Sequence, residues 1–441
     1  MGILSKRLSS RRLSTRRLST KRLSTRRLST RRLFRRFDFV PRSAWWVIGA
    51  RGLRAFAHGF LSVGLAIFLT DKGLGLGGVG LFLSAGVAGG ALWALGLGAL
   101  ISRFGRRRSL VGLTLVSAGF SAALLTTDSP AWLAIFSLLG GLSGVGGAGG
   151  AGPAQPLEQT ILADACPSSR HASLFALYRF VASGATAAGG LAAGIPGWLE
   201  SAGLLSMTTG LACLVAAFAL CLLAVAGLYS RLPASVESEP TQPAWSNPLN
   251  TPSRHLILRL NALFGVDQLG SSLVPTALLT YWFHSEFGLE LGELAVLAAS
   301  AHLLSAFSMV LSVRLSARIG YVRTMVFSHL PASLMLVALP FAPNVAVAVA
   351  LWLGRGLLSQ MDIPARDALI MAAVPPDERV AMASVHLMGR NGMGTVGPVL
   401  ATALWQSWSA AAPLLGGGLL KVGYDLALYS AYRKHRFDES E

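Results

Sequence analysis

The stretch Gly98-Ala-Leu-Ile-Ser-Arg-Phe-Gly-Arg-Arg-Arg-Ser-Leu110 separates two long apolar runs, and a shorter copy, Arg318-Ile-Gly-Tyr-Val-Arg-Thr-Met325, separates two more. The copies share an arginine, a glycine and a second arginine: Arg103, Gly105 and Arg108 in the first, Arg318, Gly320 and Arg323 in the second. Outward from these loops, a second pair of segments also matches: Pro156-Leu-Glu-Gln159 and Pro364-Ala-Arg-Asp367. Two halves with matched loops are typical of secondary transporters.

The composition excludes an ordinary cytosolic enzyme. The chain has 441 residues, of which 53% are hydrophobic and only 13% are charged, whereas a soluble protein carries about a quarter charged residues. Three cysteines without CxxC spacing are too few for a disulfide framework. The eight histidines are scattered without ligand spacing, so we expect no metal site and no cofactor.

The apolar runs predict an all-α membrane protein with twelve transmembrane helices in two pseudo-symmetric six-helix bundles. Each run has the roughly 20 residues that a membrane span needs, and the expected spans are 44–70, 77–101, 109–127, 131–154, 172–196, 204–229, 256–283, 291–313, 322–341, 345–370, 381–405 and 409–432. A proline-rich stretch between the sixth and seventh runs has linker composition. The predicted organisation is a basic tail (1–43), a bundle (44–229), a linker (230–255), a bundle (256–432) and a short tail (433–441).

The loop charges predict the orientation. Every even-numbered connection carries arginine, whereas the odd-numbered ones carry Lys72 alone among several acids. By the positive-inside rule, both termini are expected in the cytoplasm of a multi-pass protein of a cell (inner) membrane.

The amino-terminal tail is a five-residue repeat of the type Arg-Arg-Leu-Ser-Thr, and it holds much of the net charge of +18. We interpret it as a disordered cationic arm that attracts anionic lipids of the bilayer. Three alternatives stay open: a kinase site, an organelle transit peptide, or a repeat without function. Because the charge belongs mostly to this tail, nucleic-acid binding is not predicted.

The loop after the second run resembles the signature of the major facilitator superfamily, Gly-x-x-x-Asp-Arg-x-Gly-Arg-Arg. Ser102 stands where the family has the Asp that helps latch the cytoplasmic side, and Ala317 does not replace it. The resemblance implies a gating role for this loop. We add Glu158 as a candidate: it either joins a gate network with Arg170 or with the loop arginines, or it lies at a solvated helix end. The candidate gating residues are Gly98, Ser102, Arg103, Gly105, Arg106, Arg107, Glu158, Arg318 and Gly320.

Charged residues at membrane depth are the candidates for a substrate and proton pathway, because each costs roughly 3 kcal/mol on insertion scales. They are Arg54, His58, Asp267, Arg355 and Arg390. The resemblance implies that the first, fourth, seventh and tenth helices line a central cavity. Asp267 is the hypothetical carrier of a coupling proton, with His58 second; the alternative is a fixed ion pair between Asp267 and Arg54.

Fixed cations outnumber acids at membrane depth, and this excess of positive charge suits an anionic substrate. The alternative is that the additional cations interact with the C-termini of helices. Lys421 and Asp425 are spaced to pair within one helix. The resemblance implies a secondary transporter that moves a small organic solute by alternating access, with efflux as the commoner use of the family. We also expect proton coupling and a monomer, and no enzyme, because no nucleophile–base cluster or metal-ligand set appears at membrane depth. The alternative is a non-transporting sensor or scaffold that keeps this fold.

Overall fold

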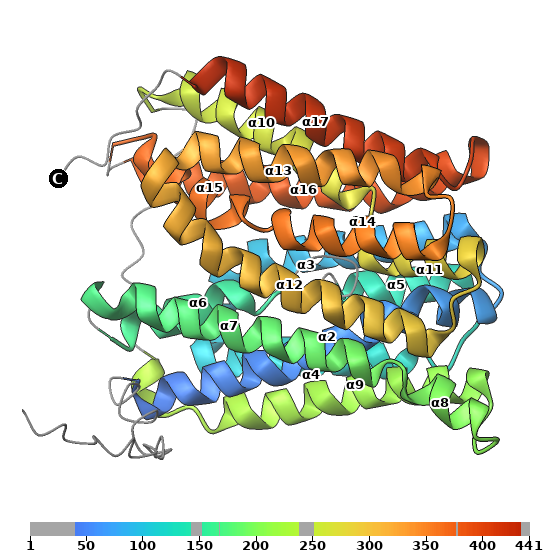
Figure 1. Ribbon diagram of the computed structural model, residues 1–441. Coiled ribbons are helices and arrows are strands. Elements are labelled where there is room, and N and C mark those ends of the chain that lie inside the picture. Colours follow the sequence, from blue (N-terminus) through green and yellow to red (C-terminus); the bar gives the residue numbers. More distant parts are fainter. Residues whose placement is uncertain (1–39, 143–151, 167, 238–250, 376–377, 434–441) are drawn as a thin grey trace, which may run out of the picture. The chain divides into compact units, whose positions relative to one another are not determined.

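The computed structural model describes residues 40–142, 152–166, 168–237, 251–375 and 378–433, and it is helical without a strand in these ranges (Figure 1). The basic tail, and with it the hypothesis of a lipid-binding arm, lies outside the described residues.

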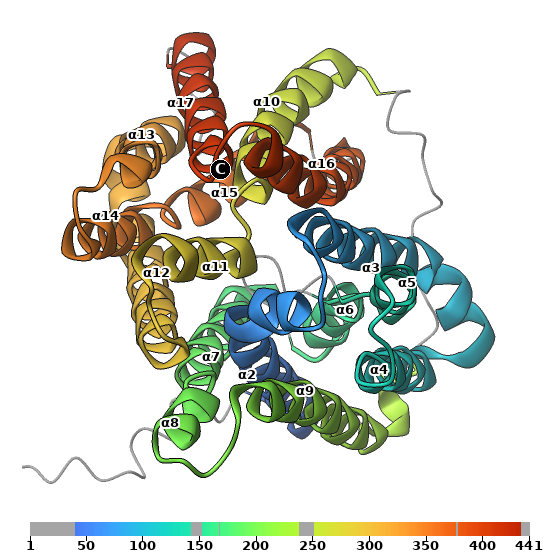
Figure 2. The same ribbon diagram turned by 90° about the vertical axis from the view of Figure 1, so that its right-hand side faces the viewer.

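The helices form two halves. The amino-terminal half contains α2 (Arg42–Asp71), α3 (Leu76–Phe104), α4 (Arg106–Ala123), α5 (Pro130–Gly140), α6 (Gln155–Asp164), α7 (Ser168–Ala192), α8 (Ile195–Ser201), α9 (Met207–Ser230) and the short η3 (Ala234–Val236). The carboxy-terminal half contains α10 (Arg254–Ser272), α11 (Thr276–Phe287), α12 (Leu291–Ile319), α13 (Tyr321–Ala338), η4 (Leu339–Phe341), α14 (Val345–Leu358), α15 (Asp362–Ala372), α16 (Arg379–Ser407) and α17 (Ala412–Tyr432). Counting α5 with α6, α10 with α11 and α14 with α15, the described helices correspond to the twelve expected spans, six in each half, and Figure 2 shows them end-on. The fourth span differs from the expected 131–154, because α5 ends at Gly140, residues 143–151 lie outside the described ranges and α6 begins only at Gln155.

The repeat is reproduced in the backbone. The 29-residue helix α3 is followed by Gly105 and an 18-residue helix, and α12 is followed by Gly320 and an 18-residue helix. Both glycines have a left-handed φ, 80° at Gly105 and 82° at Gly320, which side chains other than glycine rarely adopt. The fourth and the tenth span each contain two described helices: α5 ends at Gly140, before the left-handed Gly141, and α6 begins at Gln155, whereas α14 ends at Leu358 and α15 begins at Asp362.

The helices are built to cross a membrane. Within the described ranges, six helical stretches are long and apolar enough to do so by length and composition: Arg42–Asp71, Leu76–Leu97, Met207–Ser230, Arg254–Phe287, Leu291–Ser308 and Tyr321–Phe341. The other spans are broken, as α14 and α15 are, or carry charges, as α17 does with Lys421 and Asp425. Many large apolar side chains are exposed on the helices, among them Leu95 and Phe307, as expected where lipid replaces water.

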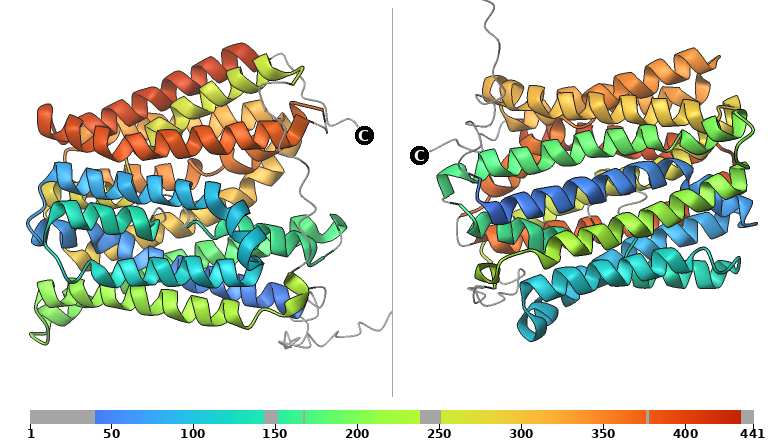
Figure 3. Two further views of the ribbon diagram at one scale, coloured as in Figure 1. Left: turned by 180° about the vertical axis from the view of Figure 1, so that it is seen from behind. Right: turned by 90° about the horizontal axis from the view of Figure 1, so that it is seen from below.

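The two ends of the molecule differ. We call the end with the α3–α4 and α12–α13 turns the basic end, and the end with the α2–α3 and α11–α12 turns the opposite end (Figure 3). Near the opposite end the two halves pack without space for added atoms: a Cβ on Gly80 of α3 would lie 2.1 Å from the Thr402 hydroxyl of α16. Thr280 of α11 donates a hydrogen bond of 3.2 Å to the Val63 carbonyl of α2. The hydrophobic core at this end draws residues from both halves, so the opposite end is closed.

Candidate functional site: two buried charge clusters

The first cluster surrounds Glu158, which is fully buried near the start of α6. Its carboxylate accepts hydrogen bonds of 2.6 Å from the Arg54 guanidinium of α2 and 2.6 Å from the Tyr178 hydroxyl of α7. The Tyr229 hydroxyl of α9 donates to the other carboxylate oxygen and accepts from Arg54. We call these four residues the Glu158 cluster. Four helices are therefore joined by one ion pair whose charges are hydrogen-bonded, the condition under which a buried pair is tolerated.

Arg51 and His58 lie one turn to either side of Arg54 on α2, and both are buried. The Arg51 guanidinium lies over the Tyr178 ring, 5.4 Å from its centre, in a cation–π geometry. The His58 ring meets the Phe218 ring of α9 edge-on, with 5.1 Å between centres. His58 therefore borders the Glu158 cluster but makes no hydrogen bond through its Nδ1 to any described residue.

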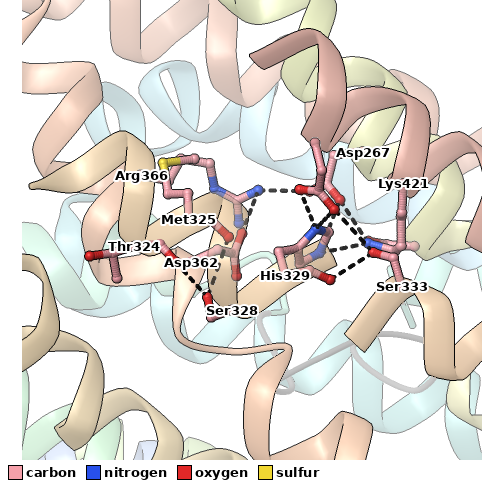
Figure 4. Close-up of polar contacts among 11 residues, drawn as sticks. Asp267, Thr324, Met325, Ser328, His329, Ser333, Asp362, Arg366 and Lys421 are labelled. Carbon is pink, nitrogen blue, oxygen red and sulfur yellow. Dashed lines mark hydrogen bonds and ion pairs between the residues drawn. The ribbon is translucent and has the colours of Figure 1, made fainter. Parts of the chain in front are cut away.

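The second cluster surrounds Asp267 of α10 (Figure 4). Arg366 of α15 donates to one oxygen of Asp267 at 2.9 Å, and Lys421 of α17 donates to the other at 2.7 Å. Asp362 of α15 lies 3.5 Å from the Arg366 guanidinium. Both oxygens of Asp267 thus face a fixed cation. We call the following residues the Asp267 cluster: Asp267, His329, Asp362, Arg366, Lys421 and Asp425, all buried.

His329 of α13 joins the two ends of this cluster. Its Nδ1 lies 2.9 Å from one oxygen of Asp425 and 3.1 Å from the other. Its Nε2 lies 3.4 Å from the Lys421 ammonium and 3.5 Å from Asp267 Oδ1. The imidazole is therefore placed between two carboxylates, with an ammonium beside one of them.

Asp267, His329 and Asp362 each offer an atom within 4.8 Å of the others, the spacing of a metal site. The Lys421 ammonium and the Arg366 guanidinium already occupy oxygens of this group, at 2.7 and 2.9 Å. A metal ion placed there would meet two fixed cations at close range, so the donor set fits an ion-pair network better than a metal.

The structure decides between the pairings that the sequence left open. Arg54 pairs with Glu158, and Asp267 pairs with Arg366 and Lys421, so the alternative of an Arg54–Asp267 pair is wrong. Lys421 and Asp425 bind Asp267 and His329 respectively. Glu158 is not a solvated helix end, and the side chain of its expected partner Arg170 lies outside the described residues.

Arg355 and Arg390 are outside the hydrogen-bonded networks of both clusters, although the charge of each interacts with those of Asp267 and Asp362. Arg355 is half-buried in the last turn of α14, with its guanidinium 4.8 Å from the centre of the Trp352 ring. Arg390 of α16 is exposed. Neither forms an ion pair with any residue that the structure describes.

Among the described residues, one ion pair joins the two halves. Arg179 of α7 lies 3.2 Å from Asp367 of α15, and the two side chains are 48% and 47% exposed. Asp367 is five residues from the end of α15, so this contact lies in the basic half of the molecule, opposite the closed end.

The loop arginines of the first half act locally. Gly105 and Arg106 begin α4, where the Glu237 carboxylate accepts from the backbone N–H groups of Arg106 (2.7 Å) and Arg107 (3.2 Å). A carboxylate at a helix N-terminus satisfies unpaired N–H groups and the helix dipole. The Arg106 side chain also pairs with Asp164 at the end of α6, at 2.6 Å.

The other expected gating residues are placed at the same turns. Ser102 donates back to the Ala99 carbonyl of its own helix, and Arg103 lies over the neighbouring Phe104 ring. Gly98 lies in α3, and Arg318 is an exposed residue of the last turn of α12, before Gly320. Their gating role stays a prediction.

His329, Tyr229 and the role of Asp367 were not predicted from the sequence. A lone histidine or tyrosine in an apolar run gives no periodic signal, so only counting every polar residue at membrane depth would have found them. Asp367 was noted only as part of a repeated segment.

Comparisons with known proteins agree with this architecture. Residues 260–434 match the family model described as Major Facilitator Superfamily. An uncharacterised membrane protein of Saccharomyces cerevisiae is 23% identical over 382 residues, which cover 79% of this chain and 84% of the yeast protein.

Solved transporters share the fold at low identity. The D-xylose–proton symporter has a TM-score of 0.68 at 17% identity, covering 88% of this chain and 97% of its own. The nucleoside transporter NupG has a TM-score of 0.65 at 14% identity, covering 90% and 100%. A bacterial homologue of the human lysosomal transporter Spinster, inward-facing and occupied, has a TM-score of 0.65 at 15% identity, covering 90% and 98%.

Proposed function

Because this chain is a member of the major facilitator superfamily, by its fold throughout and by the sequence of its carboxy-terminal half, we propose that it is a proton-coupled transporter of a small organic anion. Membership makes it a multi-pass membrane protein of a transporter family. The coupling ion, the substrate class and the direction are our proposals.

The observation that carries proton coupling is the pair of buried charge clusters beside the interrupted fourth and tenth spans. Interrupted helices at equivalent places in two halves mark binding sites in transporters. Buried ionisable groups in membrane helices are costly and typically serve ion or proton pathways. Asp267, Arg54 and His58 belong to or border these clusters, which supports their place on the pathway.

Arg355 and Arg390 support an anionic substrate. Both lie at membrane depth on helices of the carboxy-terminal half, and neither has an ion-pair partner among the described residues. A guanidinium without a carboxylate offers paired donors to a carboxylate or phosphate group of a solute.

For orientation we propose that the basic end faces the cytoplasm, as the loop arginines predict. The proposed direction is efflux, which rests on the commoner use of this family. The opposite end would then be the outer side, closed in this structure by the α3–α16 and α2–α11 contacts.

The test is a thermal-shift screen of the purified protein in detergent against organic anions, organic cations and neutral metabolites. A ligand that binds only the folded state raises the Tm by mass action. We expect stabilisation by an anion that is lost in Arg355→Gln and retained in Arg314→Gln, which changes an exposed arginine of α12. Stabilisation by cations alone would contradict the anion assignment.

The hit is then tested for flux in proteoliposomes with an imposed pH gradient, in both orientations of the gradient. Accumulation that follows the gradient and is abolished by Asp267→Asn supports coupling, whereas flux that ignores the gradient contradicts it. No flux of any ligand that stabilises the protein would favour the alternative, a non-transporting sensor or scaffold.

A further inference from the structure

The charges of the Asp267 cluster do not balance when its histidine is neutral. The cluster holds three carboxylates, Asp267, Asp362 and Asp425, against the fixed cations Arg366 and Lys421. Arg355 and Arg390 also act on Asp267 and Asp362 through their charges, but Asp425 has no fixed cation in ion-pair contact when His329 is neutral. A buried carboxylate without such a cation is costly, and one additional proton on the His329–Asp425 pair removes this cost.

The geometry identifies where that proton would be held. Asp267 already receives a cation on each oxygen, and Asp362 lies beside Arg366. Asp425 instead receives its hydrogen bonds from neutral groups, the His329 ring and the Ser333 hydroxyl at 3.2 Å.

Besides Asp425, the carboxylate within reach of His329 among the described residues is Asp267, whose Oδ1 lies 3.5 Å from Nε2. Of the helices that pack on α13, α17 contributes Lys421, Asp425 and the Tyr424 ring, whose centre lies 5.9 Å from that of the imidazole. Helix α15 contributes Asp362 and Arg366, and α10 contributes Asp267. Arg355 of α14 is turned onto Trp352, and α12 has no group within ion-pair distance of His329 among the described residues.

We propose that His329 and Asp425 together form the proton-binding site of this transporter, on α13 and α17. The role of this site in transport rests on the proposed function, whereas the proton-binding site itself does not. The proton is bound by a histidine–carboxylate pair beside Asp267, and the Asp267 carboxylate stays ion-paired with Arg366 and Lys421.

The pair is connected to the helix contacts through Lys421. A neutral imidazole with its proton on Nδ1 can accept at Nε2, the atom that faces the Lys421 ammonium at 3.4 Å. A proton added at Nε2 turns this acceptor into a donor, so imidazolium and ammonium then compete for Asp267 Oδ1. Protonation therefore weakens the tie between α17 and α10, which gives the proton a means to shift the helices.

The experiment is a histidine titration by NMR of the full-length protein, labelled in its eight histidines, in detergent from about pH 5 to about pH 9. The His329 resonance is the one that disappears in His329→Gln. We expect it to titrate, and we expect Asp425→Asn to lower its midpoint by about one pH unit or more, because the carboxylate that stabilises the imidazolium is gone.

The matched control is His386→Gln. His386 of α16 belongs to the same half but contacts an amide, Asn261, at 3.2 Å instead of a carboxylate, so its loss should leave the His329 titration unchanged. If His329→Gln does not fold, the comparison of wild type with Asp425→Asn still identifies the resonance by its shift. A His329 resonance that keeps one form over the whole range, or titrates identically in Asp425→Asn, overturns the proposal.

Transport is measured separately, as acidification inside proteoliposomes that contain a pH-sensitive dye and the stabilising anion. A titrating His329 in a protein that moves no solute upholds the site and overturns the proposed function. Gradient-driven flux that persists in Asp425→Asn overturns the role of the pair in coupling.

Discussion

Glu158 and Arg366 hold the same place in the two halves and carry opposite charges. Each follows a proline by two residues, Pro156 in α6 and Pro364 in α15. Each pairs with the opposite charge on the first helix of its own half: Glu158 with Arg54 at 2.6 Å, and Arg366 with Asp267 at 2.9 Å. The repeat has thus kept an ion pair between its first and fourth spans while exchanging the two partners.

The first prediction concerns this pair in the amino-terminal half. Glu158→Gln leaves the Arg54 guanidinium buried without its counter-ion, so we expect a loss of about 3–5 kcal/mol in unfolding free energy. The measurement is the Tm in detergent, with the exposed Glu286→Gln as the control that changes little. The double exchange Arg54→Glu with Glu158→Arg should recover part of the loss; equal loss in both variants would show that the charges do not act as a pair.

The second prediction concerns Tyr229, whose hydroxyl both donates to Glu158 and accepts from Arg54. Tyr229→Phe keeps the ring and removes the two bonds, so we expect about 2 kcal/mol of destabilisation, as for hydrogen bonds to charged groups. Thermal unfolding measures it, and Tyr281→Phe, in which no hydrogen bond is removed among the described residues, is the comparison. An unchanged Tm in Tyr229→Phe would contradict the network.

The third prediction concerns the ion pair between the halves, Arg179 and Asp367. Because both side chains are about half exposed, the pair contributes under about 1 kcal/mol. That is enough to change a two-state population about five-fold. Asp367→Asn should therefore raise the fraction of molecules open at the basic end while leaving the Tm nearly unchanged.

Spin labels at positions 108 and 323, both exposed residues of the basic end, report this opening as a longer distance. Asp128→Asn is the matched control, because it breaks an ion pair with Lys72 inside one half and involves none of the candidate gating residues. A distance distribution that is identical in wild type and Asp367→Asn would rule out a gating role for the pair.

The fourth prediction concerns Gly80, where α3 and α16 meet near the closed end. A methyl group there would lie 2.1 Å from the Thr402 hydroxyl and 2.8 Å from the Pro398 carbonyl, and a backbone carbonyl cannot yield cheaply. Gly80→Ala should push the halves apart at this end and make cysteines introduced there react faster with a water-soluble thiol reagent. Gly96→Ala changes a residue of the same helix at which an added Cβ has nothing within 4 Å, so it should leave the cysteine reactivity unchanged. Equal reactivity in both variants would contradict the close packing of the two halves at this end.

The fifth prediction concerns Gly105. Its φ of 80° is left-handed, and a Cβ at this residue would lie only 2.4 Å from a Glu237 carboxylate oxygen, so both the backbone and the space disfavour a side chain. Gly105→Ala should destabilise the protein by about 1–3 kcal/mol, measured by thermal unfolding. Glu237→Gln, which weakens the charge at the start of α4, should cost about 1 kcal/mol or less; a larger loss there than in Gly105→Ala would contradict this account of the turn.

The fold was predictable because its signal is local. Runs of about 20 apolar residues and the arginine-rich loops occur in the sequence itself, and the membrane leaves few alternatives to spanning helices. The positions of Arg54, Glu158 and Asp267 could therefore be assigned to their helices from the sequence.

The pairing of these residues could not be predicted in the same way. Whether Arg54 meets Glu158 or Asp267 depends on how each helix is rotated and shifted against its neighbours, which hydropathy does not encode. Lys421 shows the difficulty: its spacing to Asp425 allows a pair within α17, yet it reaches across to Asp267 at 2.7 Å. His329 was missed because a single polar residue in α13 changes the hydropathy of its span very little.

The exchange of partners between Glu158 and Arg366 has a consequence for the response of the protein to membrane voltage. The two halves of this fold are related by an axis along the membrane normal, so their equivalent ion pairs have opposite dipole components along that normal. A charge moved through the full membrane field gains about 2.3 kcal/mol per 100 mV, but displacements of these two opposed dipoles offset each other. The membrane voltage should then act on the protein mainly through the net charge that it transports across the membrane.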